Sequence, residues 1–168
     1  MKNNLKVLRN IIVVSILILN SNKIFATSVN FSVTATVQPY CSIAATNLSF
    51  DPYTSQNNSD KTSVITVTCT AGTGYHVKLD SGQNSSSTST RKMKGAASAS
   101  NLLQYFLYSD SARTVIWGNN ANNSDSPPGA GTGLAQTYTV YGRIPSGQKT
   151  TVPVDNYSDQ IAASITIP

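Results

Sequence analysis

Short segments in which apolar and polar residues alternate recur along this chain, and they constrain its fold more than any other feature. Residues 64–69, 75–79, 136–144 and 161–167 each show this alternation, with mostly branched or aromatic apolar side chains. A period of two is typical of strands that have one buried face. No segment keeps a helical period over a useful length. The sequence therefore predicts an all-β fold, a β-sandwich of seven or more short strands.

The connections between these segments are rich in residues that favour turns. Three stretches, 51–61, 81–100 and 119–133, are mostly polar or rich in Gly and Pro, and we expect surface loops there, the second around a short strand at Met93. In the third stretch, Pro127, Pro128 and three glycines argue against any regular element. Residues 102–108 and 114–117 are expected to form a hairpin. We find no repeat and no sign of a second domain.

The first 26 residues have the pattern of an export signal. Lys2, Lys6 and Arg9 precede an uncharged apolar run at 11–19, and Ala26 supplies a small residue for cleavage. A membrane span is the alternative, but the run has about ten residues where a span needs about twenty. We therefore expect residues 1–26 to be removed, which leaves an exported chain without a membrane span.

The charge of the exported part does not indicate a nucleic-acid partner. The full chain has a formal charge of +5, but four of its twelve basic residues lie in the signal segment. The remaining eight basic residues are balanced by seven acidic ones, and their one cluster is Arg91, Lys92 and Lys94. Binding to phosphate needs a clustered basic surface on the folded domain. We interpret this short cluster as a solvated loop or strand end.

The chain has two cysteines, Cys41 and Cys69. In an oxidising compartment they have one pairing available within the chain. They lie 69 − 41 = 28 positions apart, and loop entropy then gives about 3.6 kcal/mol of stabilisation. A metal site is the alternative, but His76 is the one histidine and no third cysteine is present. We predict a disulfide, and we expect no metal and no cofactor.

Candidate catalytic residues are few. A Ser-His-Asp hydrolase needs a positioned base, and His76 shares a polar strand face with Lys78 and Asp80. The glycines at 129–133 lack the lysine and the following helix of a phosphate-binding loop. The acidic residues are seven scattered aspartates, and nothing pairs them for glycoside hydrolysis. We expect that the chain is not an enzyme, and a secreted enzyme that uses His76 is the alternative.

Arginine and aromatic residues accompany the later strands. We expect Arg113 or Arg143 to pair with Asp110 or Asp159 at strand ends. We interpret five aromatic residues as core or subunit contacts, namely Tyr108, Trp117, Tyr138, Tyr141 and Tyr157. A glycan-binding patch is the alternative, because aromatic faces suit sugars.

Two alternating segments lie near the two ends of the exported chain. The first places apolar side chains at Val29, Phe31, Val33, Ala35 and Val37, and the second places them at Ile161, Ala163, Ile165 and Ile167. Pattern alone favours the first as a strand of the chain's own sandwich. Because Pro39 separates it from the rest, it is also suited to add to a sheet edge of another chain. The second segment fits a closing strand or an edge for a partner strand.

A series of motifs in order resembles the spore coat protein U domain family, whose members are largely subunits of archaic chaperone-usher pili. The matching features begin with Cys41, the triplet at 48–50 and the Val-Thr-Cys at 67–69, followed by Arg91 and Met93. They continue with the run at 107–113, then Trp117-Gly118, the Gly-Thr-Gly at 131–133, the runs at 140–145 and 147–148, and finally the Tyr-Ser-Asp at 157–159.

The resemblance implies an immunoglobulin-like β-sandwich that lacks one strand, so that a hydrophobic groove stays open. A periplasmic chaperone fills this groove first, and the N-terminal segment of the next subunit replaces it at an outer-membrane usher. With the resemblance included, we expect residues 27–38 to be a donor-strand segment that uses Val29, Phe31, Val33, Ala35 and Val37. Residues 39–168 would be the pilin-like domain, with the strand at 161–167 bordering the groove.

The function that the resemblance implies is that of a structural subunit of a surface pilus, built by donor-strand exchange and supporting adhesion or biofilm formation. Its partners would be the chaperone, the usher and identical or related subunits, and its place would be the cell surface after export through the periplasm. Two alternatives share this fold, a tip adhesin that binds a glycan or surface and a structural protein of a spore or cell coat.

Overall fold

The computed structural model of the chain describes residues 25–148 and 152–168. The chain consists of two units, with the boundary between Thr36 and Val37. The second unit, Val37–Pro168, contains every described strand. The expected signal peptide, residues 1–26, lies almost entirely outside the described residues. The described part of the chain contains no helix long and apolar enough to cross a membrane. It contains the 3₁₀ turn η1, Thr88–Thr90.

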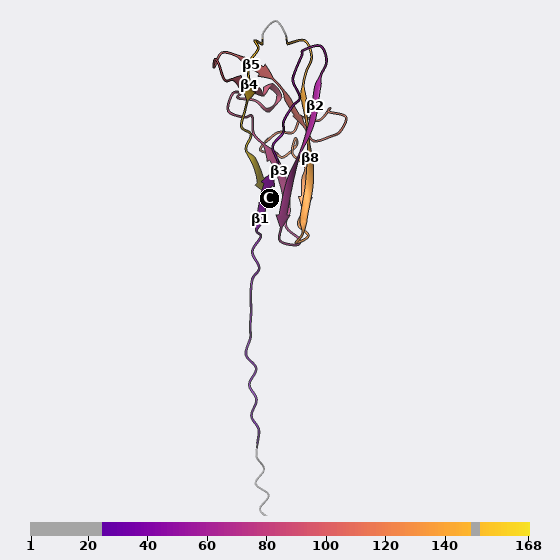
Figure 1. Cartoon of the computed structure of the whole chain (residues 1–168). Helices are drawn as coiled ribbons and strands as arrows, with labels where there is room; N and C mark the ends of the chain where they lie inside the picture. The colour runs from indigo at the N-terminus through magenta and orange to yellow at the C-terminus, as the bar shows by residue number, and fades with distance from the viewer. Residues whose placement is uncertain (1–24, 149–151) are drawn as a thin grey trace, which may run out of the picture. The chain divides into compact units, whose positions relative to one another are not determined.

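The largest sheet has four strands in the order β1-β2-β8-β6. Its centre is the long antiparallel pair of β2 (Ser59–Cys69) and β8 (Ala135–Ile144), which lie side by side in Figure 1. The strand β1 (Cys41–Ala45) pairs with β2 on one side, and β6 (Phe106–Tyr108) pairs with β8 on the other. Alternation in β2 turns Ile65, Val67 and Cys69 inward.

Two further sheets have three strands each. In one, β3 (Gly74–Leu79) lies between β10 (Ala163–Thr166) and β7 (Pro128–Ala130). In the other, β4 (Lys92–Gly95) lies between β5 (Leu102–Gln104) and β9 (Tyr157–Ser158). All pairings are antiparallel.

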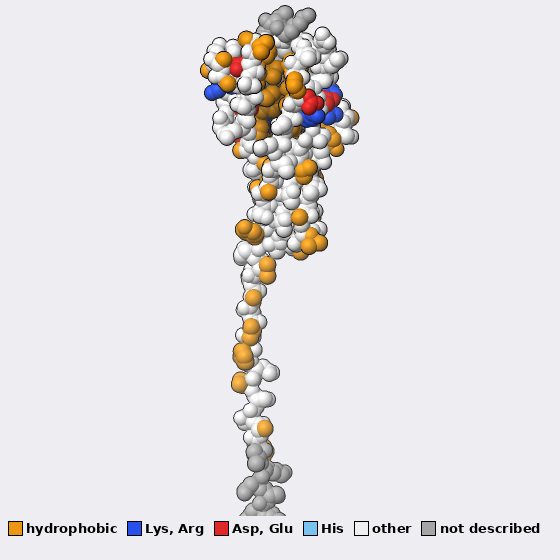
Figure 2. Space-filling model, viewed as in Figure 1, with side chains coloured by type: hydrophobic (Ala, Val, Ile, Leu, Met, Phe, Trp, Pro, Cys, Tyr) orange, Lys and Arg blue, Asp and Glu red, His pale blue; other side chains and the backbone are white. Residues whose placement is uncertain are grey.

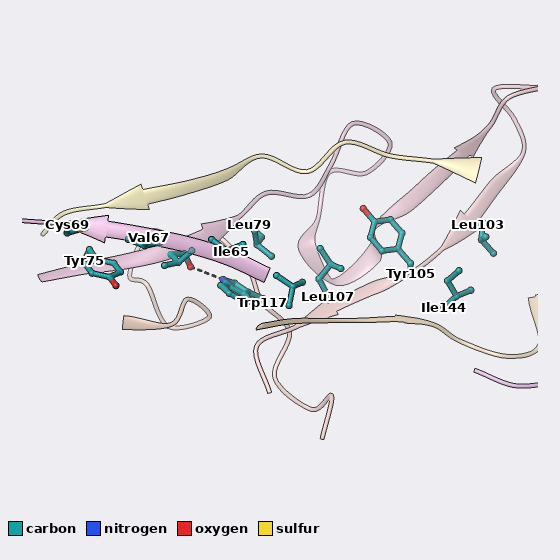
Figure 3. Packing of buried hydrophobic residues seen from close by; sticks show 12 residues of the cluster. Ile65, Val67, Cys69, Tyr75, Leu79, Leu103, Tyr105, Leu107, Trp117 and Ile144 are labelled. Carbon is teal, nitrogen blue, oxygen red and sulfur yellow. Dashed lines mark hydrogen bonds between the residues drawn. The ribbon is translucent and has the colours of Figure 1, made fainter. Parts of the chain in front are cut away.

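The core forms where the inward faces of the first two sheets meet (Figure 3). Trp117 is fully buried at its centre, and its indole Nε1 donates a hydrogen bond of 2.8 Å to the carbonyl oxygen of Val77. Most of the other fully or nearly buried side chains come from these two sheets, including Ile65, Val67, Tyr75, Leu79, Leu107, Val140 and Ile144, and β5 of the third sheet adds Leu103. Because both layers contribute to one cluster, the fold is the predicted β-sandwich.

The predicted disulfide is present. Cys41, the first residue of β1, lies opposite Cys69, the last residue of β2, and a disulfide joins the two. The bond therefore fixes the start of an edge strand to the end of a central strand.

Three expectations about loops and strands were wrong. The stretch 51–61 was expected to be a loop, but β2 already begins at Ser59. The first residues of β2 show no apolar alternation, because Asp60 and Lys61 make ion pairs instead of apolar contacts. The stretch 119–133 contains β7 despite Pro128, which is tolerated at the first position of an edge strand. Gly129 lets β7 approach closely, since a Cβ there would lie 2.3 Å from the ring of Tyr75.

The predicted hairpin of residues 102–108 and 114–117 was wrong only for the first part of its first run. The first run changes sheet at Tyr105, so that β5 and β6 belong to different sheets. The second run does pair with the end of the first: Ile116 bridges Tyr108, the Trp117 N–H donates to the Leu107 carbonyl at 2.9 Å, and the Ser109 N–H donates to the Val115 carbonyl at 3.0 Å.

Candidate functional site

Two sheet edges lie side by side in this domain without pairing. The strand β1 is the last strand of its sheet on one side, and β10 is the last strand of the neighbouring sheet. Their Cα atoms approach within 8 Å, but the described part of the chain contains no ladder between them. Each edge therefore presents backbone N–H and C=O groups that a further strand can use.

An open groove of about 730 Å³ begins where these edges end, at Ala45 of β1 and Ala163 of β10. One wall is formed by residues 45–50, which continue β1, and the other by residues 157–163, which lead into β10. The floor consists of core side chains, among them Ile65, Leu79 and Leu107. Leu48, Phe50 and Met93 also line a second, adjoining hollow of about 780 Å³.

The floor of the groove is apolar, whereas its walls also carry polar residues such as Asn47, Gln83 and Gln160. Figure 2 shows a band of hydrophobic side chains exposed on the wider part of the sandwich domain. Close packing holds one wall in place, because a Cβ on Gly142 of β8 would lie only 2.7 Å from Leu48 Cδ1 and 2.9 Å from Phe50 Cζ. Exposed apolar side chains in a groove with unpaired edges are suited to an extended, apolar segment.

The strand expected to border the groove is found there in part. Ile161 and Ala163 line the groove directly, and both pack against the core together with Ile165. Ile167 is 41% exposed and lies beyond the end of β10.

A network of polar residues fixes the wall that carries Ile161. The carboxylate of Asp159 accepts hydrogen bonds from the Tyr105 hydroxyl at 2.7 Å and from the backbone N–H of Gln83 at 3.0 Å. Asp80 Oδ1 accepts hydrogen bonds from the backbone N–H groups of Gly82 and Ala162, both at 3.0 Å. Burial, together with the bond to Asp159, raises the pKa of Tyr105 far above its ordinary value. The tyrosine therefore stays a neutral donor that holds residue 159 against the core.

The N-terminal alternating segment has no secondary structure in this chain. Residues 25–40 carry no strand, and each of their side chains is exposed. The apolar side chains Val29, Phe31, Val33 and Val37 are 80–88% exposed, and Ala35 is exposed as well.

Arg91 has a role that the sequence did not suggest. We expected it in a solvated cluster with Lys92 and Lys94, but its side chain is fully buried. Its guanidinium donates hydrogen bonds to four backbone carbonyl oxygens at 2.6–3.1 Å, those of Leu79, Asp80, Thr88 and Trp117. Burial lowers its pKa from the ordinary value. Arg91 thus joins the end of β3, the turn η1 and the strand segment at Trp117. The sequence signal that marked it was its place in the matched motif series.

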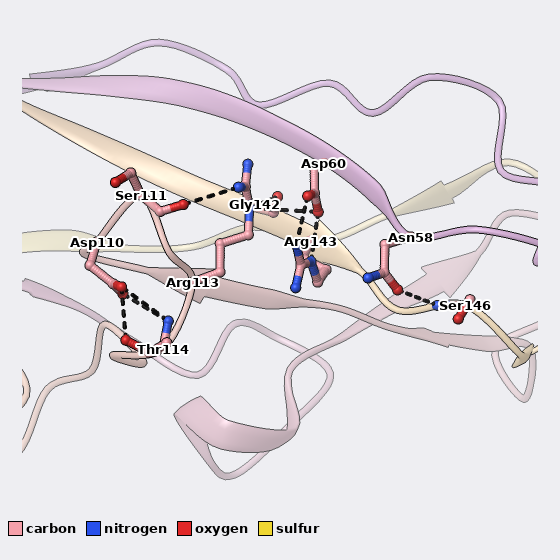
Figure 4. Close-up of polar contacts among 9 residues, drawn as sticks. All are labelled: Asn58, Asp60, Asp110, Ser111, Arg113, Thr114, Gly142, Arg143 and Ser146. Atoms are coloured by element: carbon pink, nitrogen blue, oxygen red, sulfur yellow. Dashed lines mark hydrogen bonds and ion pairs between the residues drawn. The ribbon is translucent and has the colours of Figure 1, made fainter.

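The arginines of the later strands pair with a different aspartate than expected. Arg143 makes two hydrogen bonds of 2.7 Å to the carboxylate of Asp60, and Arg113 Nε lies 3.5 Å from the same group (Figure 4). Asp110 instead accepts hydrogen bonds from the backbone N–H groups of Thr114 and Val115. The hydrogen bond from Arg143 holds the pKa of Asp60 below its ordinary value.

The aromatic residues divide between the core and the outer face of the first sheet. Trp117 and Tyr138 pack edge to face, with ring centroids 6.4 Å apart, and Tyr138 donates a hydrogen bond to Tyr75. Tyr141 and Tyr108 lie opposite each other in the β6–β8 ladder, and Arg113 stacks 5.7 Å from the ring centroid of Tyr141.

Nothing in the described residues assembles an active site around the one histidine. His76 lies on β3 with its Nδ1 3.1 Å from the carbonyl oxygen of Ser126. Within residues 25–148 and 152–168, no group of three or more His, Cys, Asp or Glu residues is placed to hold a metal ion.

Comparisons with known proteins agree on one relationship. The chain is 36% identical over 110 residues to Protein U of Myxococcus xanthus, covering 62% of this chain and 59% of that protein. Its fold resembles a chain of the CsuC–CsuE chaperone–tip adhesion subunit pre-assembly complex from archaic chaperone-usher Csu pili of Acinetobacter baumannii, with a TM-score of 0.57 and 21% identity. It also resembles a chain of a chaperone–tip adhesin complex of CFA/I fimbriae, with a TM-score of 0.50 and 12% identity. These matches cover 77% and 76% of this chain but only 40% and 41% of those chains. Residues 27–164 match the model of the Spore Coat Protein U domain, and the chain therefore belongs to the Spore Coat Protein U domain family.

Proposed function

We propose that this chain is a structural subunit of a surface pilus, assembled by a chaperone-usher pathway through donor-strand exchange and supporting adhesion or biofilm formation. The observation that carries the proposal is the groove with an apolar floor between residues 45–50, which continue the unpaired edge of β1, and residues 157–163, which lead into β10. The same chain carries an exposed alternating segment at 29–37 of the kind that such a groove accepts. The donor strand of each incoming subunit would complete the sandwich of the subunit before it.

The physical reason for exchange is complementary exposure of apolar surface. The groove exposes core side chains, and the N-terminal segment exposes five apolar side chains at every second position. Their full burial would contribute at most about 7–15 kcal/mol. Ordering the extended segment opposes this gain. Hydrogen bonds to the two unpaired edges then fix the register, as in other cases of strand addition.

The partners follow from the same groove. Before assembly, an edge strand of a periplasmic chaperone would cover it, with β10 as the neighbouring strand. An outer-membrane usher would exchange the chaperone for residues 27–38 of an identical or related subunit. Removal of residues 1–26 on export would free this segment, and the sandwich at 39–168 would then lie in a filament at the cell surface.

The family and the structural neighbours are structural proteins rather than enzymes, and the chain is accordingly not an enzyme. An enzymatic activity that is lost when His76 is replaced would support the alternative, a secreted enzyme.

A tip adhesin is the second candidate, because the chains of similar fold come from complexes that contain tip subunits. This chain has its own alternating N-terminal segment, which favours a subunit that donates a strand to its neighbour. A coat protein, the third candidate, would share the fold and would differ in lacking chaperone and usher partners.

The proposal is tested by co-expression with the cognate chaperone, purification of the pair and a polymerisation assay. Deletion of residues 27–37 should leave the chaperone complex intact and abolish incorporation as the next link. The substitution Val33→Asp should do the same, because a buried unpaired charge costs several kcal/mol.

The matched control is Thr34→Asp, which places the same charge on the opposite, polar face of the segment and should polymerise normally. Loss of the chaperone complex in the deletion variant would contradict the proposal. Normal polymers from Val33→Asp would contradict it as well.

A further inference from the structure

In a filament of the proposed kind, tension on a subunit enters through its N-terminal segment. The covalent chain leads from residue 37 through Pro39 to Tyr40 and Cys41, where β1 begins. At this point Tyr40 is held by Thr70 on both its backbone groups. The N–H of Thr70 donates to the Tyr40 carbonyl at 2.9 Å, and the Tyr40 N–H donates to the Thr70 hydroxyl at 3.2 Å.

The strand that receives this tension is a weak one. β1 has five residues and occupies the edge of its sheet, where β2 is its one hydrogen-bonded neighbour within the described residues. Because tension enters at the first residue of β1, it would separate the β1–β2 pairs in turn, starting at Cys41. Backbone hydrogen bonds that open one after another resist force poorly, since each contributes only about 1 kcal/mol.

We propose that the Cys41–Cys69 disulfide transmits this tension past β1 into β2 and so keeps the donor groove intact under load. The inference rests on the proposed function. Cys69 ends the eleven-residue strand β2, which is paired with β1 on one side and with β8 from Ser59 to Thr68 on the other. The disulfide thus connects the incoming chain to a central strand whose inward side chains are buried in the core.

Because β1 leads into one wall of the groove, separation of β1 from β2 would also affect the donor strand. Ala45, the last residue of β1, and Thr46 to Phe50 after it form one wall of the groove. If β1 separated from β2, this wall would lose its support, and a donor strand seated in the groove would be released. A subunit pulled from its N-terminus would then lose the neighbour held in its groove.

The test uses polymers of the full exported chain held at constant force and at zero force. One sample keeps the disulfide, and the other is treated with a reductant after assembly, with thiol alkylation to verify that both cysteines are free. Under force, reduction should shorten filament lifetime about tenfold or more, which corresponds to a barrier lowered by at least about 1.4 kcal/mol. At zero force, the two samples should dissociate at the same rate.

Each other result contradicts the inference. Equal lifetimes under force would mean that the disulfide carries no tension, and equally faster dissociation at zero force would mean that it stabilises the subunit in general. Absence of polymers from the oxidised chain would overturn the proposed function itself, and the inference with it.

A second pair of variants keeps both cysteines and changes the neighbouring hydrogen bond. Thr70→Val removes the hydroxyl that bonds to Tyr40 at nearly constant shape, while Thr70→Ser retains a hydroxyl. With the disulfide reduced, Thr70→Val should shorten the lifetime under force further than Thr70→Ser. With the disulfide intact, the two variants should match. A difference that persists in the oxidised polymers would show that tension passes through the hydrogen bonds rather than through the disulfide.

Discussion

Replacement of the buried Arg91 by methionine should destabilise the domain strongly. The change removes the donors to four backbone carbonyl oxygens, those of Leu79, Asp80, Thr88 and Trp117. A buried acceptor left without a partner costs about 1–3 kcal/mol. Methionine also relieves the cost of burying a charge, and this gain offsets part of the loss.

We expect a net loss of about 3 kcal/mol or more in the free energy of unfolding, since removal of one partner from a buried charged network costs about 3–5 kcal/mol. In a domain of this size that lowers the melting temperature by roughly 10 °C. The assay is thermal and urea unfolding of the oxidised chain, followed by circular dichroism.

Lys94→Met is the matched control, because Lys94 lies in the same basic run but is exposed. It should change the stability by less than about 0.5 kcal/mol. If Arg91→Met were as stable as this control, the role assigned to the guanidinium would be refuted.

Three further predictions concern other parts of the sandwich. Asp60→Asn should destabilise the chain near neutral pH. Because the pKa of Asp60 is lowered in the folded state, the difference from the wild type should begin to shrink as pH falls below the ordinary value of about 4 and vanish only below the folded-state pKa. Urea unfolding at several pH values measures this. Gly129→Ala should cost about 1–3 kcal/mol, because its Cβ would overlap an aromatic ring, whereas Gly74→Ala meets no atom within 4 Å and should be neutral in thermal unfolding. Tyr105→Phe should cost about 1.5–3 kcal/mol through the lost hydrogen bond to Asp159, and it should raise hydrogen exchange in residues 159–163.

Alternation in the sequence was enough to locate the central strands. The inward faces at Ile65 and Val67, and at Tyr75 and Val77, are those that the period of two predicts. The disulfide followed from two cysteines in an exported chain. The strands could be predicted from the local sequence pattern, and the disulfide from the oxidising compartment. Neither prediction requires knowing which strands are neighbours.

The features that were missed depend on tertiary contacts. β7 forms at Pro128 because its edge position does not need that N–H group, and edge position is a property of the whole sheet. The chain passes from one sheet to another at Tyr105, but the sequence there shows no interruption that would predict this change. Arg91 lies next to Lys92 in the sequence, and only the converging carbonyl oxygens distinguish a buried arginine from a solvated one.

The groove itself was expected from the resemblance and not from the residues alone. The sequence shows that β10 alternates, but it cannot show that β1 and β10 end up adjacent and unpaired. That arrangement results from the sheet orders. The role of Val29 to Val37 as a donor strand remains a prediction.

Photocrosslinking from the N-terminal segment tests the donor-strand account most directly. A photoreactive benzoyl-phenylalanine at position 33 is placed in polymers that mix isotopically labelled and unlabelled chains, and crosslinked peptides are identified by mass spectrometry. The account predicts crosslinks from position 33 to residues 46–50 or 159–163 of a different chain, the two walls of the groove. Crosslinks confined to the same chain, or to surfaces away from these walls, would contradict it.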